Sequence, residues 1–291
     1  MRVGLVTRNA RLYSSRRFIQ AIRELGHEPV VIDPFCCVLS LNPVSIRLKN
    51  RPLRPVDVAI PRVGATGSSI VMAVLRHLQM TGTRLLNTVD AISIARDKLQ
   101  TLQCLQLAGI PVPRTVFSVD SKQLERALKP LGTPVIFKVL DGLQGAGVVM
   151  AESTRSTSSV IDWFQSSRTD FIAQAFVHDA DNADIRCLVL DGKIIAAMRR
   201  KAQDGEFRSN LHRGGTAEMV IPTPDEIEMS CAAAAALGLR LAGVDILRSG
   251  NGSYVIEVNA SPGIEGIEGV VLNDLARVIV EGACRELSKA T

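Results

Sequence analysis

The segment that decides the fold lies near the C-terminus and reads Ala242-Gly-Val-Asp-Ile-Leu-Arg-Ser-Gly-Asn-Gly-Ser-Tyr-Val-Ile-Glu-Val-Asn-Ala-Ser-Pro-Gly263. Two runs rich in Val, Ile and Tyr flank the short loop Gly250-Asn-Gly252, and this pattern predicts an antiparallel β-hairpin. A turn centred on Asn251 would pair Asp245 with Glu257 across the two strands. The sequence therefore predicts two carboxylates that face each other in one sheet.

The second strand of this hairpin predicts one polar face and one core face. Side chains alternate along a strand, so residues two positions apart share a face. The polar face is expected to carry Val255, Glu257 and Asn259, and the core face Tyr254, Ile256 and Val258. Two carboxylates and one amide would then lie together.

Two like charges placed directly opposite each other require a counter-charge. Hard oxygen donors without nearby His or Cys favour Mg²⁺ or Mn²⁺, and three side chains would leave metal positions open for water and phosphate oxygens. Asp245, Glu257 and Asn259 are therefore candidate ligands of a nucleotide-bound metal. The alternative is that Glu257 and Asn259 simply end an exposed strand.

Composition limits the class of protein. The chain has 291 residues, 46% hydrophobic and 22% charged, which is typical of a folded protein with two or three domains. A run of about 18 apolar residues is absent, so no membrane span is expected. The segment Met1–Thr7 leads directly into a predicted strand without the apolar stretch of a signal peptide, and we expect a cytoplasmic protein.

The cysteines, histidines and basic residues exclude other classes of site. Six cysteines without C-x-x-C spacing and only four histidines give little support for zinc. The net charge of +5 is modest and its Lys and Arg residues are scattered, so direct binding of nucleic acid is not expected.

The first ninety residues alternate between strand and helix patterns and predict a small open parallel α/β sheet. No G-x-G-x-x-G or G-x-x-x-x-G-K-[ST] motif occurs in the chain, so a nucleotide is not expected to bind at the first strand. Pro61-Arg-Val-Gly64 follows a predicted strand, where open α/β sheets place ligands. This corner is a candidate for substrate contacts, with a solvated loop as the alternative.

The middle of the chain carries a second unusual residue. Asp90–Leu107 predicts one long helix that includes Lys98. Further on, Lys138 lies inside the apolar strand pattern Thr133–Leu140, and a lysine there needs an anionic partner unless it reaches solvent from an edge strand. The glycine-rich loop Gly142–Gly147 follows at once, and glycine allows backbone N–H groups to approach phosphate oxygens closely.

Taken in order, these features resemble the ATP-grasp ligases. The residues that carry the resemblance are Lys98, Lys138, Gln174-Ala-Phe176, Asp184-Ile-Arg186, Arg208-Ser-Asn210, Asp245 and Glu257-Val-Asn-Ala-Ser-Pro-Gly263. Further segments are similar to the RimK type, the glutamate ligases that modify ribosomal protein: Leu12-Tyr-Ser14, Asp33-Pro34, Asn42-Pro43, Ile60–Gly64 and Gly205–Gly215. The resemblance covers nearly the whole chain.

This resemblance implies a mixed α/β and α+β fold in three parts. They are an N-terminal open α/β substrate domain (1–95), a central subdomain with a glycine-rich lid (96–175) and a C-terminal subdomain with the metal site (176–291). ATP is expected between the last two parts. The implied ATP contacts are Lys98, Lys138, Gly145, Ala175, Phe176, Asp184, Arg208, Ser209 and Asn210.

The resemblance also implies chemistry and partners. Asp245, Glu257 and Asn259 would hold two Mg²⁺ or Mn²⁺ ions, while Lys138, Arg208 and Arg213 would act in phosphoryl transfer. L-glutamate would be added to an acidic C-terminal carboxylate on a protein or peptide, such as a ribosomal protein, by a homo-oligomeric enzyme. Family members often carry Glu where this chain has Ala175, so we expect a backbone contact to adenine there. The alternatives are a ligase for another amino acid or a small-molecule acceptor, and a nucleotide-binding regulatory protein that keeps the fold without turnover.

Overall fold

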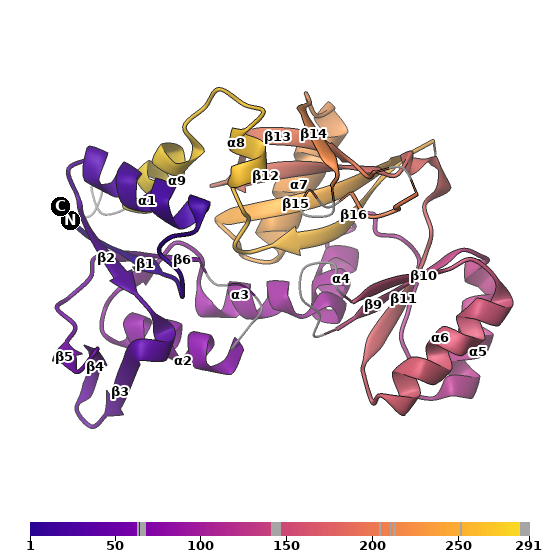
Figure 1. Cartoon of the computed structure of the whole chain (residues 1–291), viewed down its shortest axis with the longest axis horizontal. Coiled ribbons are helices and arrows are strands. Elements are labelled where there is room, and N and C mark those ends of the chain that lie inside the picture. Colours follow the sequence, from indigo (N-terminus) through magenta and orange to yellow (C-terminus); the bar gives the residue numbers. More distant parts are fainter. Residues whose placement is uncertain are drawn as a thin grey trace.

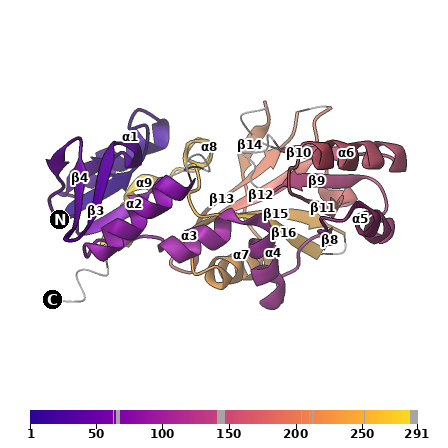
Figure 2. The same cartoon turned by 90° about the horizontal axis from the view of Figure 1, so that it is seen from below.

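The fold is seen in a computed structural model that describes residues 1–62, 64, 68–140, 147–203, 205–209, 211, 214–250 and 252–285. Three portions, each built on a sheet, follow one another along the long axis of the molecule (Figure 1). The C-terminal sheet lies between the N-terminal portion and the small central portion, and a second view shows the same order (Figure 2). The middle of the molecule is therefore built from the end of the chain.

The N-terminal portion contains the predicted open parallel sheet, with strand order β2-β1-β6-β7. Its elements are β1 (Arg2–Val6), α1 (Tyr13–Glu24), β2 (Glu28–Ile32), β6 (Val58–Pro61), α2 (Ser68–Met80) and β7 (Arg84–Leu85). The chain between β2 and β6 forms an additional antiparallel sheet, which was not predicted. It follows η1 (Pro34–Cys36) and consists of β3 (Cys37–Leu41), β4 (Val44–Leu48) and β5 (Arg51–Pro52).

The prediction of one long helix over Asp90–Leu107 was wrong. The structure has two helices, α3 (Val89–Arg96) and α4 (Lys98–Leu107). Asp97 between them has an extended backbone, and its side chain accepts a hydrogen bond from the N–H of Gln100. An N-cap aspartate satisfies an N–H group that has no partner within its helix, so it starts a new helix where apolar periodicity alone shows none. This break places Lys98 at the first position of α4.

The central portion is an antiparallel sheet with strand order β10-β9-β11-β8. Its elements are β8 (Thr115–Val116), α5 (Ser121–Leu128), η2 (Lys129–Leu131), β9 (Val135–Val139), β10 (Val148–Ala151), α6 (Thr154–Ser166) and β11 (Phe171–Ala175). Phe137 packs against Phe164 and Phe171, whose rings are stacked with centroids 4.5 Å apart. These aromatic contacts bury one face of the sheet beneath the helices and leave the other face, which carries Lys138, free to meet the C-terminal sheet.

The C-terminal sheet has five antiparallel strands in the order β14-β13-β12-β15-β16. Its elements are η3 (His178–Ala180), β12 (Ala183–Leu190), β13 (Lys193–Lys201), β14 (Thr216–Met219), α7 (Pro224–Ala236), β15 (Leu241–Ser249) and β16 (Gly252–Asn259). Alternation along the strands gives the sheet two different faces. One face buries Ile185, Cys187, Val244 and Val258 in the same core cluster as α7 residues Ala233 and Ala234. The other face is polar at one end and apolar at the other.

A β-bulge corrects the predicted faces of β16. Asp245 pairs with Glu257 as predicted, but the next pair is Ile246 with Val255, so Ile256 has no partner. The extra residue interrupts alternation, and Val255 is buried in the core beside Val258 rather than on the polar face. The turn is also one residue shorter than predicted, because Ser249 pairs with Gly252. The short turn and the bulge offset each other, and the carboxylates still meet.

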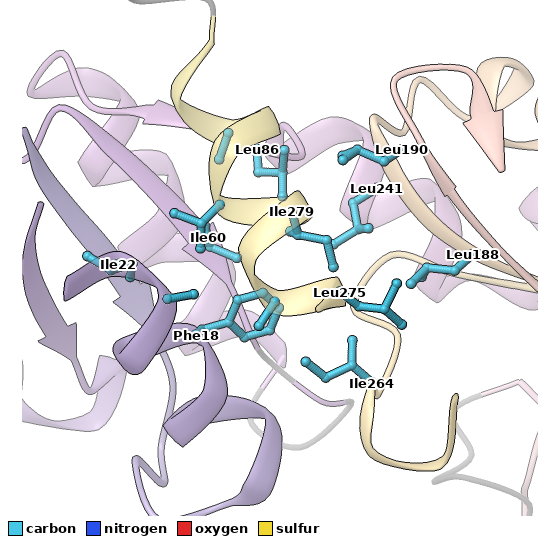
Figure 3. Packing of buried hydrophobic residues seen from close by; sticks show 14 of the residues in the cluster. Phe18, Ile22, Ile60, Leu86, Leu188, Leu190, Leu241, Ile264, Leu275 and Ile279 are labelled. Atoms are coloured by element: carbon cyan, nitrogen blue, oxygen red, sulfur yellow. The ribbon is translucent and has the colours of Figure 1, made fainter. Parts of the chain in front are cut away.

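The last helix joins the two ends of the chain into one core. After α8 (Glu265–Glu268), α9 (Leu275–Cys284) lies between α1 and the C-terminal sheet (Figure 1). Figure 3 shows Phe18 and Ile60 of the N-terminal portion on one side of α9 and Leu188 and Leu241 on the other. These residues belong to one buried cluster with Ile279. The N-terminal and C-terminal portions therefore share a continuous hydrophobic core.

A buried asparagine fixes the same junction. Asn87 is 2% exposed, and its amide nitrogen donates to the carbonyls of Leu241 (2.7 Å) and Ala260 (2.8 Å). Its amide oxygen accepts from the N–H groups of Arg240 and Leu241. Four hydrogen bonds satisfy the whole amide of Asn87. They hold the segment after β7 against the start of β15 and the residue that follows β16.

Glu226 at the start of α7 predicts a pH-dependent contribution to stability. This carboxylate is 1% exposed and accepts two hydrogen bonds from Arg248, at 2.6 and 2.8 Å. Burial raises its pKa, but Arg248 and the cap residue Thr223 outweigh burial and hold the pKa below the usual 4.5. A lowered folded-state pKa stabilises the fold above pH 4.5, and this contribution is lost as the pH falls further.

We therefore expect Arg248→Met to lower the free energy of unfolding by about 1–3 kcal/mol at pH 7, the cost of an unmatched buried acceptor. The difference from wild type should narrow as the pH falls below 4.5. Urea unfolding at several pH values measures both effects, with Glu228→Gln on the exposed side of α7 as the control. An equal difference at pH 7 and at pH 3 would contradict this role of the ion pair.

Among the helices of the described ranges, none combines the length and the apolar character that crossing a membrane requires.

Candidate functional site

Strand pairing places a row of charged side chains across the polar end of the C-terminal sheet. Arg186 of β12 is opposite Asp245 of β15, which is opposite Glu257 of β16. On the other side of β12, Asp184 is opposite Arg200 of β13. Directly opposed residues of antiparallel strands share a face, so the five side chains lie together. The sequence prediction that Asp245 and Glu257 face each other is confirmed.

Two arginines supply the counter-charge that Asp245 needs. Arg186 donates to both carboxylate oxygens at 2.7 and 2.6 Å, and Arg200 approaches Oδ2 at 3.0 Å. The carboxylate is 2% exposed. Burial opposes its ionisation, but the two guanidinium groups hold the pKa of Asp245 below its usual value. Asp245 is therefore an ionised buried carboxylate with three of its roughly four acceptor positions in use.

A second carboxylate shares one of these arginines. Asp184 accepts from Arg200 at 2.6 and 2.7 Å and from the hydroxyl of Ser209 at 2.5 Å. Burial raises the pKa of Asp184, and the nearby Asp245 adds to this, while Arg200 opposes it. Arg200 is itself buried, but the two carboxylates outweigh burial and raise its pKa. The predicted ATP contacts Asp184 and Ser209 therefore lie in one hydrogen-bonded group.

Glu257 and Asn259 have more hydrogen-bonding and metal-binding atoms available for a ligand than Asp245 has. Glu257 is exposed, and neither a hydrogen bond nor an ion pair engages it within the described residues. The Asn259 amide nitrogen is buried and has no hydrogen-bond partner in that same part of the chain. A buried amide without a partner is costly, so a ligand that satisfies it is favoured. No cluster of three or more His, Cys, Asp or Glu suited to a metal occurs among described residues, so an ion here would need Asn259 and ligand oxygens.

Two lysines approach this row of charges from the central portion. Lys138 of β9 is half-buried, and its charge interacts favourably with Glu257, Asp245 and Asp184. Burial lowers its pKa below the usual 10.5, the carboxylates oppose this shift, and the nearby charge of Lys98 adds to it. Lys98 donates to the carbonyl of Leu140 at 3.2 Å, close to the end of β9. Two ammonium groups and the carboxylates thus share one site at the junction of the portions.

Arg208 closes the site from the loop between β13 and β14. It donates to Glu206 at 2.9 and 2.7 Å and to the carbonyl of Val148 at 3.3 Å. The hydrogen bonds from Arg208 lower the pKa of Glu206 to about 2. The bond to Val148 connects this loop with β10 of the central portion. Arg208 is therefore at the junction, but its guanidinium is turned toward Glu206.

The predicted adenine contact is at the end of β11. The N–H of Ala175 donates to Arg114 and the N–H of Phe176 donates to Pro134. Both N–H groups are thus used within the molecule, and an adenine contact at these residues would rely on carbonyl oxygens. The predicted site residues Gly145, Asn210 and Arg213 lie outside the described residues, as does the predicted lid Gly142–Gly147 except for Gly147 itself.

Arg186 and Arg200 were not among the predicted site residues. The predicted counter-charge of the Asp245–Glu257 pair was a metal, whereas these arginines on the neighbouring strands provide part of it. The signal was present, because Arg186 lies two residues after Asp184 and so shares its face. The position of Arg200 opposite Asp184 depends on strand pairing and could not be found from spacing alone.

Comparison with known proteins supports one family along the whole chain. The model of the RimK PreATP-grasp domain matches residues 1–92, and the model of the RimK-like ATP-grasp domain matches residues 95–282. A "Probable alpha-L-glutamate ligase" of Marinomonas sp. (strain MWYL1) is 45% identical over 285 residues, which is 97% of this chain and 94% of the relative.

Solved structures share the fold at lower identity. A RimK domain ATP-grasp protein from Sphaerobacter thermophilus has a TM-score of 0.76 with 22% identity, covering 97% of this chain and 99% of the other. The ATP-grasp ligase PsnB in complex with a minimal precursor has a TM-score of 0.78 with 23% identity over 98% of both chains. With two family models covering almost every element described above, the chain belongs to the RimK-type ATP-grasp ligases.

Proposed function

We propose that this protein uses ATP to join the amine of L-glutamate to the C-terminal carboxylate of a protein, a peptide or a growing glutamate chain. The observation that carries the proposal is that the charge of Lys138 interacts with the paired carboxylates Asp245 and Glu257. Relatives named as probable alpha-L-glutamate ligases support glutamate as the amine. PsnB structures that contain precursor peptide, Mg and ADP support a peptide acceptor and a magnesium nucleotide.

The basic side chains would bind the phosphates. Lys138 and Lys98 bring two positive charges to the junction of the portions, and Arg208 adds a third when it exchanges Glu206 for a phosphate oxygen. Phosphoryl transfer depends mainly on positioning and on neutralising the charge of the moving group. Lys138 is suited to this because a partly desolvated ammonium interacts strongly with an anion.

Glu257 and Asn259 would be the main holders of Mg²⁺, and Asp245 would offer its one remaining acceptor position. Two carboxylate groups and the amide oxygen of Asn259 match the hard oxygen donors that Mg²⁺ prefers. The amide nitrogen of Asn259, which has no partner among the described residues, would donate to a ligand oxygen such as that of a phosphate. Magnesium would neutralise the negative charge of the β- and γ-phosphates. Arg186 and Arg200 would keep Asp245 ionised and fixed in direction.

The proposed reaction needs activation because a carboxylate is a poor electrophile. The acceptor carboxylate oxygen would attack the γ-phosphorus of ATP, the bond between γ-phosphorus and the β–γ bridging oxygen would break, and ADP would leave. The amine of glutamate would then attack the acyl phosphate, and inorganic phosphate would leave with formation of the amide and release of a proton. No covalent bond to the enzyme is required.

The test is a panel of amino acids measured for ADP release with Mg²⁺ and a peptide that ends in glutamate. We expect L-glutamate to give the highest kcat/KM, and mass spectrometry should show a product heavier by one glutamate residue. A higher kcat/KM with another amino acid would replace glutamate by that amino acid in the proposal. ADP release without any mass increase of the peptide would count against the proposed acceptor.

A further inference from the structure

Arg62 directly follows β6 and is a half-buried cation that no carboxylate pairs with within the described residues. Its Nη1 donates to the carbonyl of Pro262 at 2.6 Å, and its guanidinium lies 5.5 Å from the ring centre of Phe18. Its Nε is buried and has no partner among the described residues. Burial alone lowers the pKa of Arg62 to about 10. One N–H donor of this half-buried guanidinium is thus enclosed without an acceptor in the described part of the chain.

Three other arginines of the described residues, of which Arg248 is exposed, are paired differently. Arg186, Arg200 and Arg248 each donate through two nitrogens to both oxygens of one carboxylate. This arrangement matches the planar fork of arginine to a carboxylate. Arg62 has the same fork and bonds a single carbonyl. A carboxylate group of a ligand would therefore match the guanidinium of Arg62.

The acceptor of Arg62 belongs to the segment that leaves the metal-site strand. Pro262 lies three residues after Asn259, and the Ser261 hydroxyl donates to the carbonyl of Pro61 at 3.3 Å. A Cβ on Gly243, which pairs with Asn259, would lie 2.8 Å from Pro262 Cβ, so the segment packs directly on β15. These contacts fix Arg62 beside the end of the hairpin that carries Glu257 and Asn259.

A second arginine converges on the same strand end. Arg96, at the C-terminus of α3, donates to the carbonyl of Gly64, two residues after Arg62. Burial lowers the pKa of Arg96 as well. Arg96 also lies two residues before Lys98, so positive charge continues from the end of β6 to the proposed phosphate site. An acidic substrate would be attracted along this path.

We propose that Arg62 binds a non-reacting carboxylate of the acidic substrate and so selects glutamate over neutral amino acids. The inference rests on the proposed function, because it names the residue that recognises the substrate of the same site. Two sources can supply the carboxylate: free L-glutamate and the terminal glutamate of the peptide acceptor. The chemistry at Arg62 is the same in both, a two-pronged charged hydrogen bond.

The experiment compares wild type with Arg62→Met, which removes the donors and keeps most of the volume. If free glutamate is the source, KM for L-glutamate rises about 10- to 100-fold and the preference for glutamate over glutamine falls by a similar factor. If the acceptor is the source, the same changes appear for peptides ending in glutamate and glutamine. KM for ATP should change by less than about twofold, which a general structural defect would not allow.

Arg47→Met is the matched control, because among the described residues Arg47 also donates to a backbone carbonyl alone, that of Asn50, on an exposed hairpin. Unchanged preference ratios for both substrates in the Arg62 variant would overturn the inference. If that variant does not fold, Arg62→Lys decides. The lysine keeps the charge without the fork, so a KM rise of about 10-fold for one substrate supports the inference, and wild-type values for both overturn it.

Failure of the proposed function is distinguishable from failure at Arg62. If wild type shows no glutamate-dependent ADP release, the ligase proposal fails, and calorimetric titration with L-glutamate and with the peptide still tests Arg62. Binding of one of them about 10-fold weaker to Arg62→Met than to wild type supports the inference. Equal binding, or no binding of either compound to wild type, overturns it.

Discussion

Replacement of Glu257 by Gln is expected to lower kcat for ADP release by at least about 100-fold, the largest effect of any single change on the polar face. The substitution keeps the size of the side chain and removes one negative charge directly opposite Asp245. Because Arg186 and Arg200 leave Asp245 with a single acceptor position, Asp245 cannot also replace the lost ligand. Steady-state assays at saturating ATP and glutamate measure the effect.

The same variant should bind ADP in the presence of Mg²⁺ more weakly, and added Mg²⁺ should restore part of the activity. Glu228→Gln, on α7 beneath the opposite face of the sheet, is the matched control and should keep wild-type kcat. A Glu257→Gln enzyme that releases ADP at the wild-type rate would show that this carboxylate does not hold the metal.

Lys138→Met is expected to lower kcat/KM for ATP by about 100- to 1,000-fold, comparable to the loss of a preorganised donor to a developing charge. We expect the thermal midpoint of the protein without ligand to stay the same or rise. The reason is that burial already disfavours the charged ammonium, as its lowered pKa indicates. The Lys138→Met variant should therefore lose kcat/KM for ATP while its thermal midpoint stays the same or rises.

Calorimetric scans and ATP kinetics on the same preparations test this pair of effects. Lys193→Met on the exposed start of β13 is the control and should leave both quantities unchanged. A variant that loses activity together with several degrees of thermal midpoint would assign Lys138 to the structure of β9 rather than to ATP. Wild-type kcat/KM would exclude Lys138 from the phosphate site.

Residues that follow local rules could be predicted from sequence, and the exceptions have physical causes. The open parallel sheet and the site hairpin follow from apolar periodicity and turn residues, which act over a few positions. The break at Asp97 was missed because a single capping side chain competes with periodicity that continues on both sides. The bulge at Ile256 was missed because it depends on how β16 fits β15, and the shorter turn concealed the error.

The sequence by itself determined which charged residues stand on the strands of the site, because alternation places Asp184 with Arg186 and Glu257 with Asn259 on common faces. Only the tertiary structure decided their partners. Arg200 meets Asp184 and Asp245 through strand pairing, and Arg62 meets Pro262 across 200 residues because α9 and Asn87 hold the N-terminal sheet against the C-terminal one. Such contacts depend on packing between distant segments, which local patterns do not encode.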